Sequence, residues 1–211
     1  MYFVFDIGGT KIRGAVSTDK KTISDYKVFS TPGNFSEGVE MIVSAARGLS
    51  GGQKITAIAG GIGAPLNKNK TGVVTSYATI NKSLSSWAGE PLRSALETEL
   101  QATVFLENDT EVIGLAEAAQ IDDYKNKIIA YYTISSGVGG SLIDHGEISS
   151  NTMGFEPGNQ IIDPLQTLCP GCEKPGRLED LIGGNYIEER TGKLPEEIND
   201  EAFWDDIARY L

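Results

Sequence analysis

The start of the chain alternates apolar and polar side chains in a way typical of β-structure. Two runs rich in β-forming residues, 2–5 and 12–16, flank the pair Gly8–Gly9. A glycine pair suits a type I′ hairpin turn, so the pattern predicts strand, turn, strand. An apolar run at 128–134 followed by a serine- and glycine-rich turn at 135–140 repeats this plan. We therefore expect an internal structural repeat, with one hairpin in each half of the chain.

Between the two hairpins, segments with helical spacing alternate with short apolar runs. Ser36 is positioned to cap a helix whose apolar face is formed by Val39, Ile42, Val43, Ala46 and Leu49. Pro91 fits the first turn of a second helix, and residues 111–119 and 201–211 also have helical patterns. Residues 55–59 and 103–106 read as buried strands, and a glycine-rich loop is expected at 60–65. This alternation predicts an α/β fold.

The polar stretch around residues 118–127 is a natural place for a hinge between two lobes. We expect an N-terminal lobe at 1–118 and a C-terminal lobe at 119–211. Each lobe would carry one hairpin, with a cleft between the lobes.

Composition narrows the possible partners. The 18 basic and 29 acidic residues give a net charge of −11, which disfavours binding to nucleic acid or to an anionic membrane. The chain has no apolar run near the roughly 18 residues of a membrane span, and no basic segment precedes its first apolar run. We therefore expect a cytoplasmic protein. Its one histidine, His145, lies in an Asp-His-Gly turn and is expected to be a solvated loop residue.

Both hairpin turns have the chemistry of phosphate loops, although a plain turn explains each of them equally well. In the first, the backbone of Gly8 and Gly9, the Thr10 hydroxyl and the Lys11 ammonium can contact an oxyanion, and Asp6 can hold magnesium. In the second, the corresponding residues are Ser136, Gly137, Gly139 and Gly140. Two such loops in one chain are what a nucleotide held between lobes requires.

Three further segments carry polar or thiol groups, and each has more than one possible role. Asp109 follows a strand and precedes a helix, so it is either an N-cap or a general base with Asn108 beside it. Glu156 and Asn159 lie in a turn and could bind sugar hydroxyls. Cys169 and Cys172 are idle thiols, a redox pair or half of a zinc site.

Taken in order, four segments resemble the motifs of the ROK family of sugar kinases and repressors. The segment 6–11 resembles the N-terminal phosphate loop, 61–65 the Gly-x-Gly-x-Pro segment, 107–110 the motif with the catalytic Asp, and 136–140 the second phosphate loop. Leu66 stands where the family usually has Gly, and Ser136 replaces the usual Thr. The resemblance implies a two-lobed actin-like ATPase (ribonuclease H-like) fold, here with an incomplete second lobe.

The resemblance also implies an activity. It predicts an ATP- and magnesium-dependent kinase that phosphorylates a hexose hydroxyl, most simply a glucokinase-like enzyme. Asp109 would be the base. The sugar would be bound by Gly63, Asn108, Asp109, Glu156, Asn159 and Glu179. Members of the family commonly form homodimers, so the resemblance also implies a possible homodimer. The alternative function is a catalytically weak sugar-binding pseudokinase or sensor.

Departures from the family pattern bear on zinc and on the ends of the chain. Asn159 stands where the family usually has a His that binds both sugar and zinc, and Arg177 aligns with one of the zinc-binding Cys. Only Cys169 and Cys172 remain, so we expect the zinc site to be degraded. Family members run on through further segments that contact adenosine. The repressors carry an N-terminal helix-turn-helix, which we do not expect here because Asp6 lies near the start of the sequence.

Overall fold

The computed structural model describes residues 1–24, 26–74, 84–149, 155–168 and 176–211. The chain divides into two compact units, Met1–Val112 and Ile113–Leu211. The division lies inside helix α3 (Asp109–Ala118), and the expected boundary after residue 118 falls at the end of the same helix. Each unit is described by itself.

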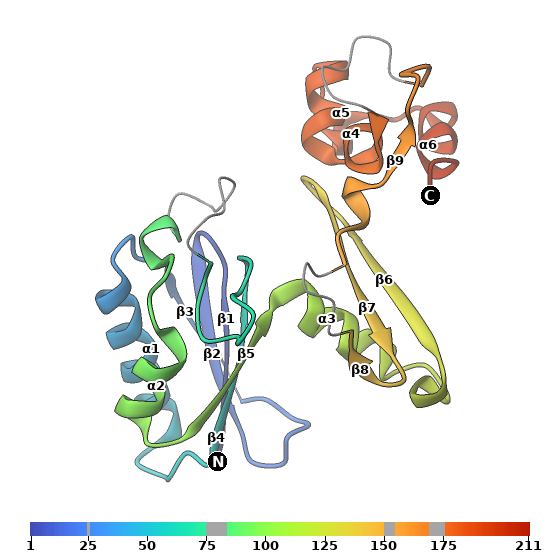
Figure 1. Cartoon of the computed structure of the whole chain (residues 1–211). Coiled ribbons are helices and arrows are strands. Elements are labelled where there is room, and N and C mark those ends of the chain that lie inside the picture. The colour runs from blue at the N-terminus through green and yellow to red at the C-terminus, as the bar shows by residue number, and fades with distance from the viewer. Residues whose placement is uncertain (25, 75–83, 150–154, 169–175) are drawn as a thin grey trace. The chain divides into compact units, whose positions relative to one another are not determined.

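The first unit is built on a five-stranded sheet with the order β3-β2-β1-β4-β5 (Figure 1). Its strands are β1 (Tyr2–Ile7), β2 (Lys11–Ser17), β3 (Lys27–Ser30), β4 (Ala57–Ile62) and β5 (Thr103–Asn108). β1, β4 and β5 are parallel, whereas β2 is antiparallel to β1 and to β3. The first hairpin and the strands near 57 and 103 are therefore confirmed. Strand β3 was not predicted.

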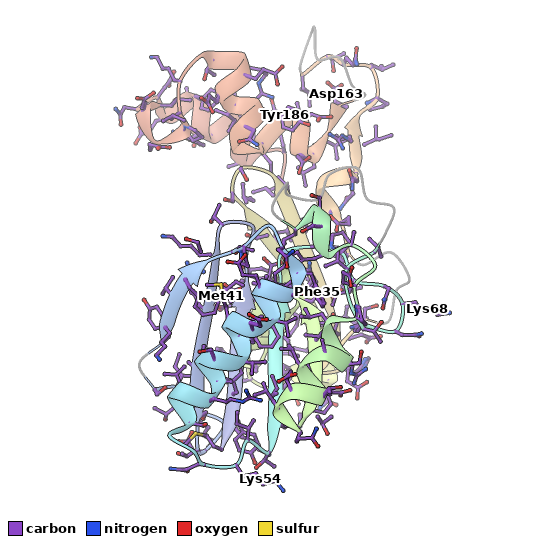
Figure 2. The ribbon with its side chains drawn as sticks, turned by 90° about the vertical axis from the view of Figure 1, so that its left-hand side faces the viewer. Phe35, Met41, Lys54, Lys68, Asp163 and Tyr186 are labelled. Atoms are coloured by element: carbon purple, nitrogen blue, oxygen red, sulfur yellow. The ribbon has the colours of Figure 1, made fainter. Side chains whose placement is uncertain are left out.

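Two helices, α1 (Phe35–Ser50) and α2 (Leu92–Leu100), cover one face of this sheet, as Figure 2 shows. They bury the alternate strand residues that point toward them, and the 3-10 turn η1 (Ser85–Trp87) adds the Trp87 indole. Fully buried members of this core include Phe3, Ile7, Ile12, Ile42, Ile58, Trp87 and Leu96. On the opposite face of the sheet Phe105 remains 57% exposed.

Helix α1 begins earlier than its pattern predicts. The N-cap is Asn34, whose side chain accepts a hydrogen bond from the Glu37 N–H at 3.1 Å. The prediction that Ser36 caps this helix is wrong, because Asn34 caps the free N–H groups two residues sooner; such a cap contributes about 1 kcal/mol. The helix ends at Gly51, which has a left-handed φ of 58°.

The glycine-rich loop expected at 60–65 begins later in the structure, because β4 (Ala57–Ile62) continues through its first residues. Gly60 and Gly61 belong to the strand and not to the expected loop. The Phe5 ring packs over Gly60 so closely that a Cβ there would lie 2.1 Å from the ring. The glycine is therefore required by packing inside the sheet.

The second unit contains the repeated hairpin. β6 (Ile128–Ile134), β7 (Val138–Asp144) and β8 (Glu147–Ile148) form an antiparallel sheet in that order, which confirms the second hairpin. β9 (Ile161–Asp163) pairs with β10 (Gly176–Arg177). The helices are α4 (Leu178–Ile182), α5 (Gly184–Thr191) and α6 (Glu201–Ala208), with 3-10 turns η2 (Tyr124–Asn126), η3 (Pro157–Asn159) and η4 (Pro195–Glu197).

The apolar core of the second unit is small. Val138, Leu178, Leu181 and Ile182 form its buried cluster, with Ile162, Ile207 and Tyr210 packed against it. The predicted C-terminal helix is present, and Trp204 on it is half-buried, with its indole N–H donating to the Ile198 carbonyl at 2.8 Å. In the described part of the chain, no helix has both the length and the apolar character to cross a membrane.

The packing of Trp87 on α1 gives a testable prediction. Gly38→Ala would place a Cβ 2.1 Å from the Trp87 ring, so overpacking should cost about 1–3 kcal/mol in unfolding free energy. Gly48→Ala is the matched control, because its Cβ meets only the flexible end of Lys27. This control should stabilise the helix by about 0.5–1 kcal/mol.

Urea unfolding in a Trp204→Phe background measures both changes, since fluorescence then reports on Trp87 alone. Equal stability of the two alanine variants would contradict the described packing.

Candidate active site

The carboxyl ends of the three parallel strands meet at one edge of the first unit's sheet. In the register of the strands, Asp6 of β1 pairs with Gly61 of β4, and Ile62 of β4 pairs with Asn108 of β5. Asp109 follows directly as the first residue of α3. Open α/β sheets place their ligands at this edge. The structure therefore brings Asp6 and Gly63 close to Asn108 and Asp109, from which they are far apart in the sequence.

Asp109 is packed against the glycines that follow the middle of β4. A Cβ on residue 61 would lie 3.4 Å from the Asp109 Cα, and a Cβ on residue 63 would lie 3.1 Å from Asp109 Oδ2. The Gly63 N–H donates to the Ile7 carbonyl at 2.8 Å, which ties this segment to β1. The expected sugar-binding residue Gly63 thus also makes room for the carboxylate of Asp109.

The two oxygens of Asp109 have different surroundings. Oδ1 accepts the Thr110 N–H at 2.8 Å, and the side chain of Asn108 accepts the same N–H at 3.0 Å. Asn108 therefore shares the task of satisfying the helix start, which the N-cap reading assigned to Asp109. No other residue in the described ranges donates to Asp109 Oδ2, so this oxygen is available to a substrate.

The environment raises the pKa of Asp109. Burial of the carboxylate is the main cause, and the negative charge of Asp6 adds to it, while the hydrogen bond from Thr110 opposes the shift. Asp6 itself forms an ion pair with Arg13, with Nη1 and Oδ2 2.9 Å apart. A carboxyl group with a raised pKa is better matched to proton transfer near neutral pH.

A charged cluster that the sequence analysis missed lies beside this site. The Lys70 ammonium donates to Glu107 and lies 3.9 Å from Glu111 Oε2. Burial acts to raise the pKa of Glu107, but hydrogen bonds from Glu111 and Lys70 outweigh it, and the pKa is lowered. Glu107 Oε1 in turn accepts the Asn108 N–H at 3.1 Å. Lys70 and Glu107 are 37 residues apart, so no local pattern could have revealed the pair.

The first hairpin turn is braced from behind by Thr31. The Thr31 hydroxyl donates to the Gly8 carbonyl at 2.6 Å, and the Thr31 N–H donates to the Thr10 carbonyl at 3.0 Å. With the carbonyls held in this way, the N–H groups of Gly9 and Thr10 have no acceptor in the described structure. Thr10 and Lys11 are exposed.

The expected type I′ turn is wrong. Neither Gly8 nor Gly9 has a positive φ. The turn is instead closed by the Gly8 N–H donating to the Lys11 carbonyl at 2.9 Å. A type I′ hairpin has a loop of two residues, whereas three residues separate β1 from β2.

The second hairpin turn is docked on the start of α5 and on α4. The N–H groups of Gly184 and Asn185 donate to the carbonyls of Ser135 and Ser136 at 2.8 and 2.9 Å. The Val138 N–H donates to Glu179 Oε2 at 2.9 Å, and a Cβ on Gly137 would lie 2.6 Å from the same oxygen. One end of the predicted phosphate loop therefore faces a carboxylate.

The remaining residues of this loop divide between the surface and the interior. Ser136 is exposed and Gly139 is partly exposed. Gly140 is buried against the Tyr131 carbonyl, which a Cβ would approach to 2.6 Å. Gly140 is thus required by packing, whatever else it contacts.

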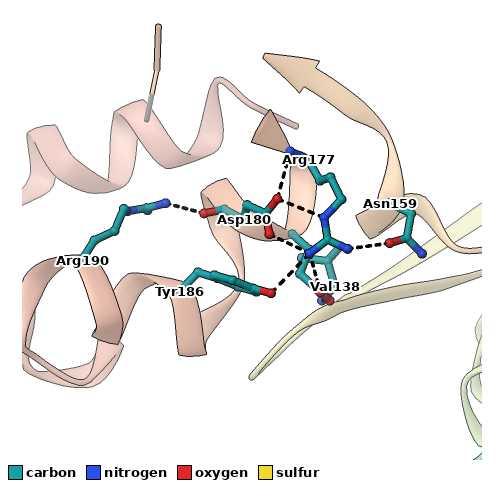
Figure 3. Close-up of polar contacts among 7 residues, drawn as sticks. Val138, Asn159, Arg177, Asp180, Tyr186 and Arg190 are labelled. Carbon is teal, nitrogen blue, oxygen red and sulfur yellow. Dashed lines mark hydrogen bonds and ion pairs between the residues drawn. The ribbon is translucent and has the colours of Figure 1, made fainter. Parts of the chain in front are cut away.

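Two carboxylates predicted to bind sugar lie near each other in the second unit. Partial burial raises the pKa of Glu156, and the negative charge of Glu179 raises it further. Asn159, at the end of η3, accepts a hydrogen bond from Arg177 Nη1 at 2.9 Å (Figure 3). The predicted sugar residues thus fall into two sets, one in each unit.

The described residues do not fit a zinc ion. No three His, Cys, Asp or Glu side chains gather closely enough to hold a metal in the ranges that the structure covers. At the two described positions that the family pattern assigns to zinc ligands, the Asn159 oxygen is bound to a guanidinium and Arg177 is itself a cation. Cys169 and Cys172 lie outside the described residues, so their role stays a prediction.

Comparison with known protein families places the chain. The ROK family profile matches residues 2–208. The chain belongs to the ROK family. This confirms the resemblance that four short motifs carried.

Several relatives of this chain are named as sugar kinases. A glucokinase of Streptomyces coelicolor is 30% identical over 204 residues, which cover 90% of this chain and 60% of the relative. An N-acetyl-D-glucosamine kinase of Vibrio cholerae is 26% identical over 201 residues, covering 89% of this chain and 65% of the relative. This ROK chain thus spans about 60% of the length of the first of these relatives.

A solved structure supports the fold. The ROK hexokinase from Thermus thermophilus has a TM-score of 0.77 and 26% identity, with 99% of this chain and 74% of that chain covered. The prediction of an actin-like ATPase fold is confirmed by this likeness.

The charge environment of Asp109 can be tested without an activity assay. In an NMR titration of side-chain carboxyls, Asp109 should titrate above the usual Asp value of about 3.9. Asp6→Asn should lower the pKa of Asp109, because it removes a neighbouring negative charge.

Asp19 is the internal reference. Backbone hydrogen bonds from Thr22 and Lys21 lower the pKa of this exposed carboxyl to about 2. Its titration should be the same in both proteins. An Asp109 pKa that does not respond to Asp6→Asn would contradict the described geometry.

Proposed function

We propose that this ROK chain is an ATP-dependent sugar kinase that phosphorylates a hexose hydroxyl and acts in the cytoplasm. The observation that carries the proposal is Asp109, whose Oδ2 accepts no hydrogen bond from another described residue and lies at the carboxyl edge of a parallel sheet. Family membership supports the reaction class. The net charge of −11 fits a small-molecule substrate better than a nucleic acid.

In this mechanism Asp109 is the general base. Oδ2 accepts the proton of the sugar hydroxyl, whose oxygen then bonds to the γ-phosphorus while the bond to the β,γ-bridging oxygen breaks. Oδ1 stays bound to the Thr110 N–H, which holds the carboxylate in one orientation. Asn108 is placed to orient the hydroxyl, and the Lys70–Glu107 pair fixes the end of the strand that carries Asn108.

The first hairpin turn is assigned to the phosphates of ATP. The N–H groups of Gly9 and Thr10, the Thr10 hydroxyl and the Lys11 ammonium are the donors it offers. In the second unit, Ser136 and the glycines of the second turn are assigned to the phosphates in the same way. The Val138 N–H of that turn already donates to Glu179.

Magnesium fits Asp6. This ion takes one or two carboxylates and completes its shell with phosphate oxygens and water, so it does not need a cluster of three acidic side chains. Asp6 Oδ1 lies on the Gly61 side, while Oδ2 is paired with Arg13. When bound, the ion would neutralise charge on the transferring phosphoryl group.

The sugar is assigned to Glu156, Asn159 and Glu179 of the second unit and to Gly63, Asn108 and Asp109 of the first. Carboxylates accept hydrogen bonds from hydroxyls, which suits a polyhydroxylated ligand. We propose glucose as the first substrate to test, because the Streptomyces coelicolor relative is a glucokinase. N-acetylated hexoses are the next, in view of the Vibrio cholerae relative.

A coupled assay of ADP release with glucose, mannose, N-acetylglucosamine and N-acetylmannosamine tests the proposal. Sugar-dependent ADP release supports it and identifies the hexose. Tight sugar binding in calorimetry without ADP release would instead support a sugar-binding pseudokinase or sensor.

The assignment of the base predicts the effect of one substitution. Asp109→Asn should reduce turnover by a factor on the order of 10²–10⁴ while sugar affinity changes little, since the amide keeps the shape but cannot take the proton. Asp122→Asn, at an exposed carboxylate of the second unit, is the control and should leave turnover unchanged. An Asp109→Asn enzyme with more than about a tenth of wild-type turnover is incompatible with this role.

The brace behind the first turn predicts a selective loss of nucleotide affinity. Thr31→Val removes the hydroxyl that holds the Gly8 carbonyl, so ATP affinity should fall by a factor of about 5, corresponding to one hydrogen bond of about 1 kcal/mol. Thr31→Ser keeps the hydroxyl and should behave like the wild type. Calorimetry with ATP and with glucose separates this from a general defect, because glucose affinity should not change. If the Thr31→Val variant is folded and binds ATP as tightly as the wild type, the Thr31 hydroxyl has no part in ATP binding.

A further inference from the structure

A single guanidinium lies at the centre of the polar groups of the second unit (Figure 3). Arg177 Nε donates to Asp180 Oδ2 at 2.9 Å and Nη2 donates to Asp180 Oδ1 at 2.7 Å, a bidentate pair. The Arg177 backbone N–H also donates to Asp180 Oδ2, at 3.2 Å. The Asp180 side chain is 2% exposed, so this ion pair is largely shielded from water. Such planar pairing is a property of arginine that lysine cannot reproduce.

The same guanidinium reaches three other side chains. Nη1 donates to Asn159 Oδ1 at 2.9 Å, Nη2 donates to the Tyr186 hydroxyl at 3.2 Å, and Nη2 lies 3.7 Å from Glu179 Oε1. Asn159 ends η3, Glu179 and Asp180 belong to α4, and Tyr186 belongs to α5. Arg177 therefore links three separate elements.

This arrangement is incompatible with zinc at the same place. Arg177 is a permanent cation, and its contact with the Asp180 carboxylate holds its pKa even higher than usual. A second cation beside it would be repelled, and the one oxygen that Asn159 could offer already accepts a hydrogen bond from Arg177. The position that the family pattern gives to a metal ligand is thus occupied by a positive charge.

We propose that Arg177, at a position where the family pattern has a zinc ligand, positions the sugar-binding face of the second unit without a metal. It is a positioning residue that acts through Asn159 and Glu179. Its bond to Asn159 Oδ1 leaves Nδ2 as the donor for a sugar hydroxyl. Glu179 is held at both oxygens, by Arg177 at Oε1 and by the Val138 N–H at Oε2. The part that concerns sugar rests on the proposed function.

The first test compares two arginines of the same network. Arg177→Lys keeps the charge but loses the fork that reaches Asn159. Arg190→Lys is the matched control, because Arg190 Nη1 and Nη2 donate to the backbone carbonyls of Asp180 and Leu181. Calorimetry with glucose should show a sugar Kd raised about tenfold for Arg177→Lys, in line with loss of a charge-assisted hydrogen bond, and little change for Arg190→Lys. ATP affinity should be the same in all three proteins.

A double-mutant cycle shows whether Arg177 acts through Asn159. If it does, Arg177→Lys should weaken sugar binding less in an Asn159→Ala background than in the wild type, because only the part that acts through Glu179 remains. Additive losses would overturn the proposal. Should Arg177→Lys fail to fold, the pair Arg177→Met with Asp180→Leu removes both charges, avoids a buried unpaired carboxylate and still leaves Asn159 without its partner.

A third measurement does not depend on sugar binding. The purified chain should hold less than one zinc ion, and dialysis against EDTA should leave its thermal unfolding midpoint unchanged. Arg177→Lys should lower this midpoint. One zinc per chain, lost together with thermal stability on chelation, would overturn the metal-free role. A chain that binds no hexose would refute the proposed function, while the zinc content and the unfolding midpoints would still decide how the second unit is held together.

Discussion

The close approach of Asp109 to a glycine-lined strand end is the constraint on which the candidate site depends. A Cβ on residue 61 would make ordinary contact with the Asp109 Cα at 3.4 Å, whereas a Cβ on residue 63 would lie 3.1 Å from Oδ2 and would require the carboxylate to shift, so its present position depends mainly on Gly63. The same closeness takes the carboxylate partly out of water and places it near Asp6. One packing relation therefore fixes the orientation of the group and sets its protonation behaviour.

Much of the first unit could be predicted because its signals are local. Alternating residues gave the hairpin strands, helical spacing gave α1 and α2, and the position of Asp109 after a strand pointed to the carboxyl edge of a sheet. Strand β3 was missed because its four residues, Lys27–Ser30, lie at a sheet edge where little is buried and no alternation is imposed. Asn34 was missed as a cap because Ser36 has equally suitable chemistry two residues later.

The unpredicted features of the site depend on pairs distant in sequence. Lys70 and Glu107 are 37 residues apart, and Thr31 contacts Gly8 across 23 residues. Arg177 could be aligned with a metal-ligand position, but its fork toward Asp180 and Asn159 is visible only in three dimensions. In the second unit, the described residues form a buried apolar cluster of four, and polar links of this kind add to its definition. A guanidinium in this role is insensitive to oxidation and cannot be extracted by a chelator, unlike a thiolate-bound metal.

The contact between Gly38 and Trp87 restricts the order in which this chain can change during evolution. Residue 38 can gain a side chain without overpacking only after the indole has been replaced by something smaller, since a Cβ would lie 2.1 Å from the ring. The reverse order passes through an overpacked intermediate, whereas shrinking Trp87 first passes through a chain with a cavity. Each order therefore passes through a less stable intermediate, and the state of one position determines the cost of a mutation at the other.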